Sequence, residues 1–267
     1  MKTRVIVGLA LVAVFVLVLV FGGFVTFALF TAVAVLSMYE MGSVMKKKGF
    51  APFMGGLYAC AALLYAVLML YKAAGMAIWC ALCVMFTVAE RLWNPKRTME
   101  DIICSLFIAI YPLLFYAILA YVACELGNGA LLLCFASPLL GDTLAYFVGT
   151  ALGKHKLCPD ISPKKTIEGS IAGLLGSVLG GVLTWVVSRL WAGVLCPPIW
   201  YAMLFGLLCG VAGQLGDLFA SMVKRWAGVK DYGTIFPAHG GVMDRLDSVL
   251  FCAPLSLLYV SAMALLV

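Results

Sequence analysis

Residues 102–121 read IICSLFIAIYPLLFYAILAY, a run without a charged side chain. A helix of roughly 20 apolar residues crosses the hydrocarbon core of a bilayer, so this run predicts a membrane span. The whole chain has the same character: 65% of its 267 residues are hydrophobic, 11% are charged, and the mean hydropathy is +1.11. Its 18 basic and 12 acidic residues are too few to cover a soluble domain of this length. The composition therefore excludes a soluble enzyme, a disordered chain and a nucleic-acid-binding protein.

Working outward from this run, the hydrophobic pattern predicts an all-α, polytopic integral membrane protein with about nine transmembrane helices. Helices are required because every backbone N–H and C=O in the hydrocarbon core needs a partner within its own segment. The expected helices cover residues 5–21, 23–39, 52–71, 74–90, 102–121, 129–152, 168–190, 199–220 and 248–267.

Basic residues gather on one side of this arrangement. All but two of the 18 Lys and Arg residues precede the first helix or follow an even-numbered one; the exceptions are Lys72 and Arg189. Because basic loops stay in the cytoplasm, we expect the N-terminus and these loops there, and the C-terminus outside. Anionic lipid headgroups attract the same charges, so basic residues alone do not mark a site. Acidic residues are more informative, since topology does not require them.

Polar residues that topology does not require concentrate in the second half of the chain. We expect residues 1–128, with about five helices, to form an N-terminal transmembrane scaffold. Residues 129–267, with about four helices and cytoplasmic loops at 153–168 and 221–247, are expected to form the membrane domain that carries the functional site.

The first polar region centres on Asp142, which lies within an apolar run. Pro138 and Gly141 precede it and can break a helix there. Irregular backbone at membrane depth is tolerated where it lines protein or a wet cavity. An ionisable residue in such a run is either functional or caps a half-helix.

A group of polar residues precedes the helix expected at 168–190. Ser162 or Thr166 can cap this helix at its N-terminus. Lys164 and Lys165 stand beside them. They either meet a phosphate near the helix N-terminus or act as ordinary cytoplasmic lysines.

The second polar region runs from residue 214 to residue 247. A stripe of side chains spaced three, four and three apart shares one helix face and is formed by Gln214, Asp217, Ser221 and Lys224. Asp244 and Asp247 share a face as well if the last helix starts there. Such carboxylates suit Mg²⁺, which takes one or two of them and completes its shell with water and substrate phosphate.

A loop rich in cations and glycine connects these two sets of carboxylates. Gly240 and Gly241 permit close approach of the backbone to a ligand. His239 either donates a hydrogen bond to a phosphate, transfers a proton, or does neither. Metal ions and cations at such a site neutralise developing charge and position phosphate oxygens, so the region indicates phosphate chemistry.

These motifs resemble a known family. The segments SMVKR at 221–225, KD at 230–231 and PAHGGVMDRLDS at 237–248 are similar to the signature of the phosphatidate cytidylyltransferases, or CDP-diacylglycerol synthases. Ala238 stands where many members carry glycine. Together with further blocks at 141–169 and 214–221, the resemblance covers roughly residues 137–250.

The resemblance implies an integral membrane enzyme that transfers the cytidylyl group of CTP to phosphatidate, giving CDP-diacylglycerol and pyrophosphate for phospholipid biosynthesis. It implies Mg²⁺, alone or with a second cation, and a homodimer in the lipid bilayer. The enzyme would lie in the cytoplasmic (inner) membrane with its active site on the cytoplasmic side. Residues 129–267 would then be the catalytic membrane domain.

Carried onto this chain, the resemblance assigns roles to residues. The expected metal ligands are Asp217 and Asp244, with Asp142 and Asp247 as further candidates. The expected phosphate-binding residues are Lys164, Lys165, Lys224, Arg225 and Arg245. The expected catalytic set is Asp217, Ser221, Lys224, Arg225, Lys230, Asp231, His239, Asp244, Arg245 and Asp247. For Asp231, the alternative is an ion pair with Lys230 that touches no ligand.

Three alternatives stay open from the sequence. A CTP-using membrane kinase or an archaeal-type lipid cytidylyltransferase would share the architecture. An ion- or proton-coupled transporter would use Asp142 and Asp217 as intramembrane carriers, although the acids cluster at the cytoplasmic edge and no inverted repeat is visible. A non-catalytic scaffold would not need the polar signature.

The spacings Gly169/Gly173 and Gly176/Gly180 allow close helix packing, within or between chains.

Overall fold

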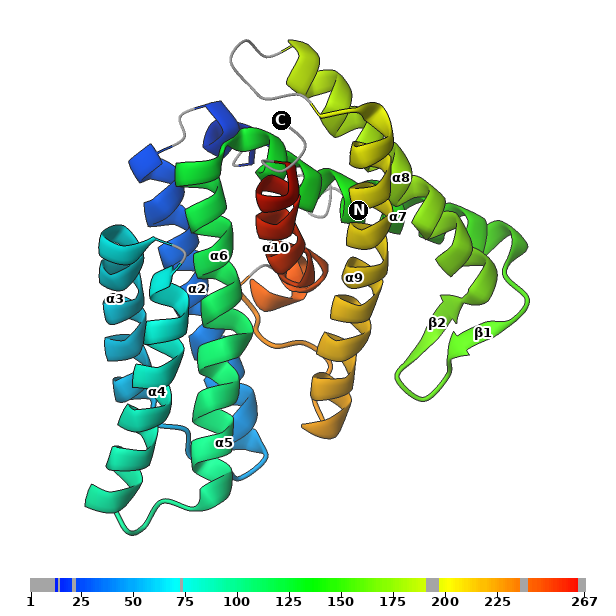
Figure 1. Cartoon of the computed structure of the whole chain (residues 1–267). Coiled ribbons are helices and arrows are strands. Elements are labelled where there is room, and N and C mark those ends of the chain that lie inside the picture. Colours follow the sequence, from blue (N-terminus) through cyan, green and yellow to red (C-terminus); the bar gives the residue numbers. More distant parts are fainter. Residues whose placement is uncertain are drawn as a thin grey trace. The chain divides into compact units, whose positions relative to one another are not determined.

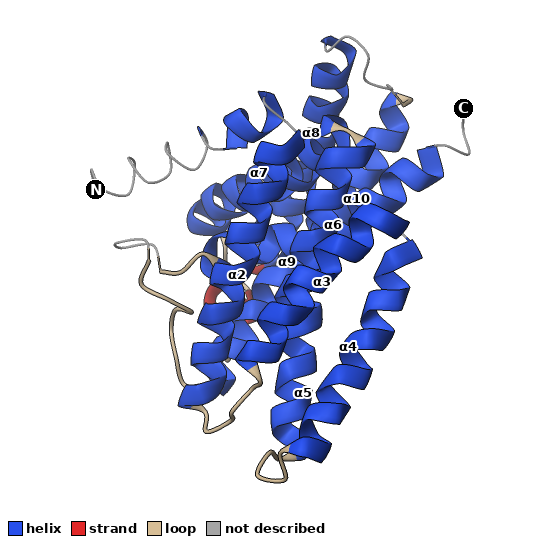
Figure 2. Cartoon of the chain, turned by 90° about the vertical axis from the view of Figure 1, so that its left-hand side faces the viewer, coloured by secondary structure: helices blue, strands red, loops and turns tan. Residues whose placement is uncertain are grey.

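The computed structural model describes residues 13, 15–20, 23–72, 74–190, 197–235 and 240–263. Helices dominate these residues (Figures 1 and 2). From residue 23 onward they are α2 (Gly23–Lys47), α3 (Met54–Tyr71), α4 (Ala74–Trp93), α5 (Met99–Ile108), α6 (Phe115–Tyr121), α7 (Asn128–Leu152), α8 (Ile167–Leu190), α9 (Ile199–Trp226) and α10 (Met243–Met263). Two π-helical turns, η1 (Ala109–Leu114) and η2 (Val122–Leu126), follow α5 and α6.

Seven helices in the described part of the chain are long and apolar enough to cross a membrane. They are Val25–Lys47, Ala74–Trp93, Met99–Leu126, Asn128–Leu152, Ile167–Leu190, Ile199–Trp226 and Met243–Met263. The expected all-α, polytopic class is confirmed. The helix expected at 5–21 lies largely outside the described residues, and the orientation of the N-terminus stays a prediction.

Several helices extend beyond the ends that hydropathy predicts, among them α2, α9 and α10. α2 continues to Lys47 instead of ending at residue 39, and α9 continues to Trp226 instead of residue 220. α10 begins at Met243 instead of residue 248. Hydropathy reports where side chains leave the hydrocarbon, whereas backbone hydrogen bonding carries a helix on into the polar region. These extra turns hold several of the residues that matter below.

The chain divides into two compact units. The first comprises Met1–Tyr121 and Trp226–Arg245, and the second comprises Val122–Arg225 and Leu246–Val267. The segment between α9 and α10 therefore groups with the N-terminal helices. The division of function at residue 128 stays a prediction.

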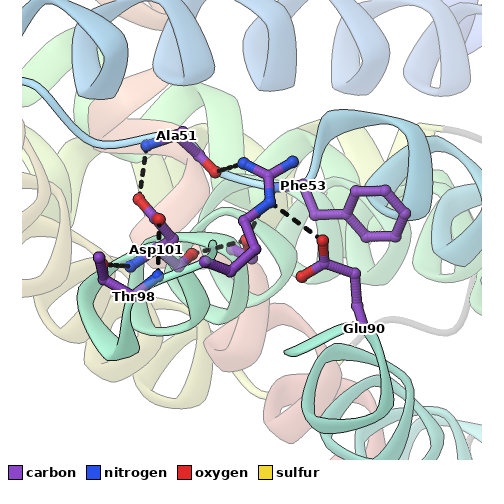
Figure 3. Close-up of polar contacts among 7 residues, drawn as sticks. Ala51, Phe53, Glu90, Thr98 and Asp101 are labelled. Atoms are coloured by element: carbon purple, nitrogen blue, oxygen red, sulfur yellow. Dashed lines mark hydrogen bonds and ion pairs between the residues drawn. The ribbon is translucent and has the colours of Figure 1, made fainter. Parts of the chain in front are cut away.

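Within the first unit, polar contacts at the start of α5 join two loops (Figure 3). Thr98 and Asp101 form a capping box: the Asp101 N–H donates to Thr98 Oγ1 at 3.3 Å, and the Thr98 N–H donates to Asp101 Oδ2 at 3.0 Å. The Ala51 N–H donates to Asp101 Oδ1 at 2.6 Å. Arg97 donates to the Ala51 carbonyl and, at 3.0 Å, to Glu90 Oε1. The loop between α2 and α3 is thereby held against the loop between α4 and α5.

Within the second unit, glycines let α8 lie directly on α7. A Cβ added at Gly176 would lie 2.5 Å from the Leu140 carbonyl oxygen, and one at Gly180 would lie 2.5 Å from Ser137 Cα. Both distances are shorter than real Cβ contacts allow. The small-residue spacing noted in the sequence therefore serves packing within the chain, which the sequence had left open.

A hairpin replaces the expected loop before α8. Strands β1 (Lys156–Cys158) and β2 (Ser162–Thr166) pair antiparallel, with Lys156 opposite Thr166. Thr166 Oγ1 accepts a hydrogen bond from the Gly169 N–H at 3.2 Å. Of the two capping residues that the sequence offered, Thr166 is the one that caps α8.

Candidate active site

Helix α9 carries the polar stripe that the sequence predicts. Because α9 continues past residue 220, Asp217, Ser221 and Lys224 belong to one regular helix. Ser221 Oγ lies 3.5 Å from Asp217 Oδ1, and Lys224 is only 9% exposed. At the membrane-ward end of the stripe, Gln214 Nε2 donates to the Ser170 carbonyl at 2.9 Å, and Ser170 Oγ donates to Gln214 Oε1. These bonds fix α9 against α8.

The β1–β2 hairpin places Lys165 in contact with Asp217 of this stripe. Lys165 Nζ of β2 lies 2.5 Å from Asp217 Oδ2, and both side chains are about a quarter exposed, 26% and 29%. An expected phosphate-binding residue thus contacts an expected metal ligand. Lys164, the neighbouring residue on β2, is exposed.

Two further carboxylates lie near Asp217. Asp142 of α7 and Asp247 of α10 are both close enough to Asp217 for their negative charges to interact, while Lys165 offsets the charge of Asp142 and Lys224 that of Asp247. We call these five residues the Asp217 cluster. Its residues come from α7, β2, α9 and α10, and all five lie in the second unit. Carboxylates outnumber lysines in it, so a cation is favoured there.

The donor chemistry of the Asp217 cluster fits Mg²⁺. Carboxylate oxygens are hard ligands, and Mg²⁺ usually takes one or two of them beside water and substrate phosphate. No three His, Cys, Asp or Glu side chains converge to hold a metal by themselves in the described part of the chain. One oxygen of Asp247, Oδ1, also accepts from the Ser248 N–H at 2.9 Å.

Asp244 belongs to the first unit and organises the segment between α9 and α10. We call this segment, residues 227–242, the signature loop, and statements about its structure concern residues 227–235 and 240–242, which the structure describes. Asp244 Oδ2 accepts hydrogen bonds from the Tyr232 N–H at 2.8 Å and the Gly241 N–H at 2.9 Å. A Cβ on Gly240, whose φ is +81°, would lie 2.8 Å from the same oxygen. One oxygen of this expected metal ligand therefore joins Tyr232 to Gly241 within the signature loop.

Glu40 of α2 is a candidate that sequence reasoning missed. It is 2% exposed, and its Oε1 and Oε2 accept hydrogen bonds from the Val242 and Met243 N–H groups, each at 2.9 Å. Glu40 falls one residue beyond the helix expected at 23–39, in the scaffold half. The available signal was an acidic residue that topology does not need, set in the run MYEMGSVM at 38–45.

The remaining expected site residues fall in or beside the signature loop and are Arg225, Lys230, Asp231 and Arg245. Asp231 lies against Gly240, where an added Cβ would be 3.3 Å from Asp231 Oδ1. The expected alternative of a Lys230–Asp231 ion pair is not present in the described coordinates of these two residues. His239 lies outside the described residues, so its expected roles stay predictions.

Fold and site together define a polytopic membrane protein in which carboxylates and lysines from α7, β2, α9 and α10 lie near one another. A sequence model of the cytidylyltransferase family matches residues 2–263, and the chain belongs to that family. The resemblance seen in the signature therefore extends over nearly the whole chain.

Curated relatives agree with this assignment. The chain is similar to the phosphatidate cytidylyltransferase of Staphylococcus haemolyticus, with 32% identity over 267 aligned positions that cover 96% of this chain and 97% of that protein. It is 30% identical to the phosphatidate cytidylyltransferase of Mycobacterium bovis, covering 94% and 85% of the two chains. The phosphatidate cytidylyltransferase of Synechocystis sp. is 49% identical over 127 positions, a match that spans 46% of this chain and 40% of that protein.

Proposed function

We propose that this chain transfers the cytidylyl group of CTP to phosphatidate, giving CDP-diacylglycerol and pyrophosphate for phospholipid biosynthesis. Family membership and relatives matched over nearly their full length support the reaction class. The structural observation that carries the proposal is the Asp217 cluster, where Lys165 Nζ lies 2.5 Å from Asp217 Oδ2. It offers carboxylates for a cation and lysines for phosphate at one place on a membrane protein.

The phosphate of phosphatidate is itself the nucleophile in this reaction. One of its oxygens forms a bond to the α-phosphorus of CTP, and the bond from that phosphorus to the oxygen bridging to the β-phosphate breaks. Pyrophosphate leaves with the electron pair, so no covalent enzyme intermediate is required. The protein must bring two polyanions together, which is unfavourable unless cationic groups offset their repulsion.

The basic residues of the site supply that offset. Lys165 and Lys164 hold the lipid headgroup or the triphosphate of CTP. Ser221 and His239 orient phosphate oxygens, and further phosphate contacts come from Lys224, Arg225, Lys230 and Arg245. These assignments rest on side-chain chemistry and on the family signature.

Carboxylates of the site hold Mg²⁺, alone or with a second cation. Asp217 is the first ligand we assign, because it sits among carboxylates and lysines on α9. Asp142 and Asp247 are candidates, and the family signature adds Asp244 as an expected ligand. When bound, Mg²⁺ neutralises charge on the phosphate oxygens.

The contact between Lys165 and Asp217 is suited to exchange. An ion pair this exposed contributes roughly 0–1 kcal/mol to stability, so it opens at little cost. With substrates bound, Lys165 would contact a phosphate oxygen, and Asp217 would be one of the residues that hold the cation. The pair thus keeps two substrate-binding groups in place before substrate arrives.

The setting of the enzyme follows from the same reasoning. The basic loops and the signature loop are proposed to face the cytoplasm, in the cytoplasmic (inner) membrane. A homodimer embedded in the lipid bilayer is proposed from the family resemblance. Family membership favours this transferase over the ion-coupled transporter and the non-catalytic scaffold.

The experiment that tests the proposal measures radiolabelled CTP incorporation into lipid. Purified, detergent-solubilised protein is supplied with phosphatidate, with and without Mg²⁺. Asp217→Asn is compared with Asp160→Asn, the same substitution at an exposed residue in the β1–β2 turn. We expect CDP-lipid and equimolar pyrophosphate from the wild type only with Mg²⁺, a loss of at least 100-fold in Asp217→Asn, and near-normal turnover in Asp160→Asn.

Two outcomes would count against the proposal. Absence of CDP-lipid from folded wild-type protein would overturn the phosphatidate reaction, and isoprenoid alcohols and ether lipids would then be screened as acceptors. Near-normal turnover in folded Asp217→Asn would remove Asp217 from the metal site.

A further inference from the structure

The carboxylate of Glu40 is buried, and removing a charged group from water costs free energy. Glu40 lies in α2 among apolar residues and is 2% exposed. A buried carboxylate persists only where hydrogen bonds or opposite charges compensate its lost hydration. Here the compensation comes from two consecutive backbone N–H groups, those of Val242 and Met243, each 2.9 Å from a different carboxylate oxygen.

These two donors belong to the start of α10. Met243 is the first residue of α10, so its N–H and that of Val242 have no acceptor within the helix. The N-terminus of a helix also carries partial positive charge, which favours a carboxylate. Glu40 therefore supplies from α2 the cap that the sequence of α10 itself lacks. The next residue, Asp244, is in the first turn of the helix that Glu40 holds.

Glycines of the signature loop make this contact feasible. A Cβ on Gly241 would lie 2.4 Å from both Glu40 carboxylate oxygens, and one on Gly233 would lie 2.3 Å from Oε1. For both glycines, the three nearest atoms to such a Cβ all belong to Glu40. Neither glycine has a positive φ, so what demands glycine here is the approach of Glu40 and not the backbone conformation.

Glu40 and Asp244 act on neighbouring stretches of the same loop. The three consecutive N–H groups from Gly241 to Met243 are all taken by these two carboxylates. Asp244 also holds the Tyr232 N–H, next to Gly233. Residues 232–233 and 241–243 are therefore gathered around two buried acids.

The beginning of the same segment is held by the N-terminal helices as well. The ring of Phe50 stacks on Trp226, with centroids 5.6 Å apart and planes 7° apart, and Lys48 Nζ lies 5.5 Å from the centroid of the Trp226 ring. The loop that carries Phe50 and Lys48 is fixed through Ala51 by Arg97 and Asp101 (Figure 3). Residues 226 to 245 are thus attached to α2 and its following loop at both ends.

We propose that Glu40 is a positioning residue for cytidylyl transfer: it holds the N-terminus of α10 and the signature loop so that Asp244 and Arg245 meet the substrates correctly. This inference rests on the proposed function. It gives helices expected to be scaffold a specific part in the reaction. Glu40 touches no substrate, so its loss should impair turnover more than binding.

The test compares Glu40→Gln with Glu100→Gln, the same substitution at an exposed residue in the first turn of α5. Gln keeps the size of the side chain but presents an amide donor to one of the two N–H groups. We measure kcat and the KM for CTP and for phosphatidate, beside the unfolding temperature and the folded fraction. The expected result for Glu40→Gln is a fall in kcat of at least 10-fold with both KM values within threefold of wild type. Glu100→Gln should match the wild type.

A second comparison separates positioning from folding. Gly241→Ala keeps Glu40 but forces it away, so kcat should fall as in Glu40→Gln. In a Glu40→Ala background the same Gly241→Ala change meets no carboxylate, and its added effect on kcat should shrink to less than twofold. Glu40→Asp keeps the charge with a shorter reach and should fall between wild type and Glu40→Gln.

The outcomes test the positioning role of Glu40 and the proposed cytidylyl transfer separately. Wild-type kcat per folded molecule in both Glu40→Gln and Gly241→Ala would overturn the positioning role while leaving the transferase intact. If Glu40→Gln does not fold, Glu40→Asp and Gly241→Ala decide by the same kcat criterion. Wild-type protein that makes no CDP-lipid would overturn the proposed function, and the positioning role with it.

Discussion

At the scale of single residues, function depends on which charges meet. Lys165 and Asp217 are 52 positions apart in sequence and in contact in the fold, while Glu40 reaches Val242 across 202 positions. The two contacts differ in exposure and therefore in consequence. The Lys165–Asp217 pair is partly exposed and exchangeable, whereas Glu40 is buried and bound to backbone groups that have no other partner in their helix.

The exposed pair leads to a prediction that separates activity from stability. Lys165→Met should lower turnover at least 10-fold, because a cation for substrate phosphate is lost. It should shift the unfolding temperature by less than about 4 °C, since such a pair contributes roughly 0–1 kcal/mol. Lys165→Arg keeps the charge and should retain more activity than Lys165→Met. The measurements are the CTP incorporation assay and thermal unfolding in detergent.

Lys96→Met, at an exposed residue outside the site, is the matched control and should change neither property. A large loss of stability in Lys165→Met with normal turnover per folded molecule would show that Lys165 serves the fold and not the substrate.

At the scale of elements, the close contact between α7 and α8 depends on glycines, which have no side chain. α7 and α8 approach each other so closely that Gly176 and Gly180 stand where any Cβ would meet the backbone of the partner helix. The contact matters to the site because α7 carries Asp142 and α8 begins at the end of the hairpin that carries Lys165. Separating the two helices would move both residues.

Gly180→Ala should therefore destabilise the protein by about 1–3 kcal/mol, the usual range for overpacking in a core. Thermal unfolding of the purified protein measures the effect. Gly55→Ala is the control: it lies in α3, and the nearest atom to an added Cβ there is a Phe53 ring carbon at 3.8 Å. That change should be neutral or stabilising by up to about 1 kcal/mol. Equal unfolding temperatures for the two variants would contradict the close α7–α8 contact.

At the scale of the whole molecule, the distribution of charge predicts orientation. Nearly all basic residues fall on one predicted face, together with the hairpin and the signature loop. Both CTP and the anionic headgroup of phosphatidate would reach the site from that face. Orientation is therefore a functional prediction as much as a topological one.

An epitope inserted after Asp160, in the β1–β2 turn, should be protected from antibody in sealed right-side-out vesicles and exposed after permeabilisation. An epitope inserted after Gly127, between η2 and α7, should be accessible in both. Retained CTP incorporation by each insertion protein is the control for correct folding. The reverse labelling pattern would contradict a cytoplasmic active site.

How much of this the sequence could predict varies by feature. The apolar runs predicted the positions of α3 to α10 within a few residues, because burying a span in lipid constrains its composition strongly. Helix ends were less predictable. Relative to the expected helices, α2 is longer by the turns that include Glu40, and α10 is longer by the turn that includes Asp244. All five residues of the Asp217 cluster were among the expected site residues, since charged side chains are unusual in an apolar chain.

By itself, the sequence determined that this protein is helical and that it crosses a membrane several times, and it predicted which polar residues carry the chemistry. These properties follow from composition and local spacing. Only the tertiary structure decided that Lys165 lies on Asp217, that Gly176 and Gly180 serve contacts within the chain, and that Glu40 caps α10. The reason is that a hydrogen bond or ion pair between distant segments depends on how helices pack, and no periodicity along one helix records which residue of another will face it.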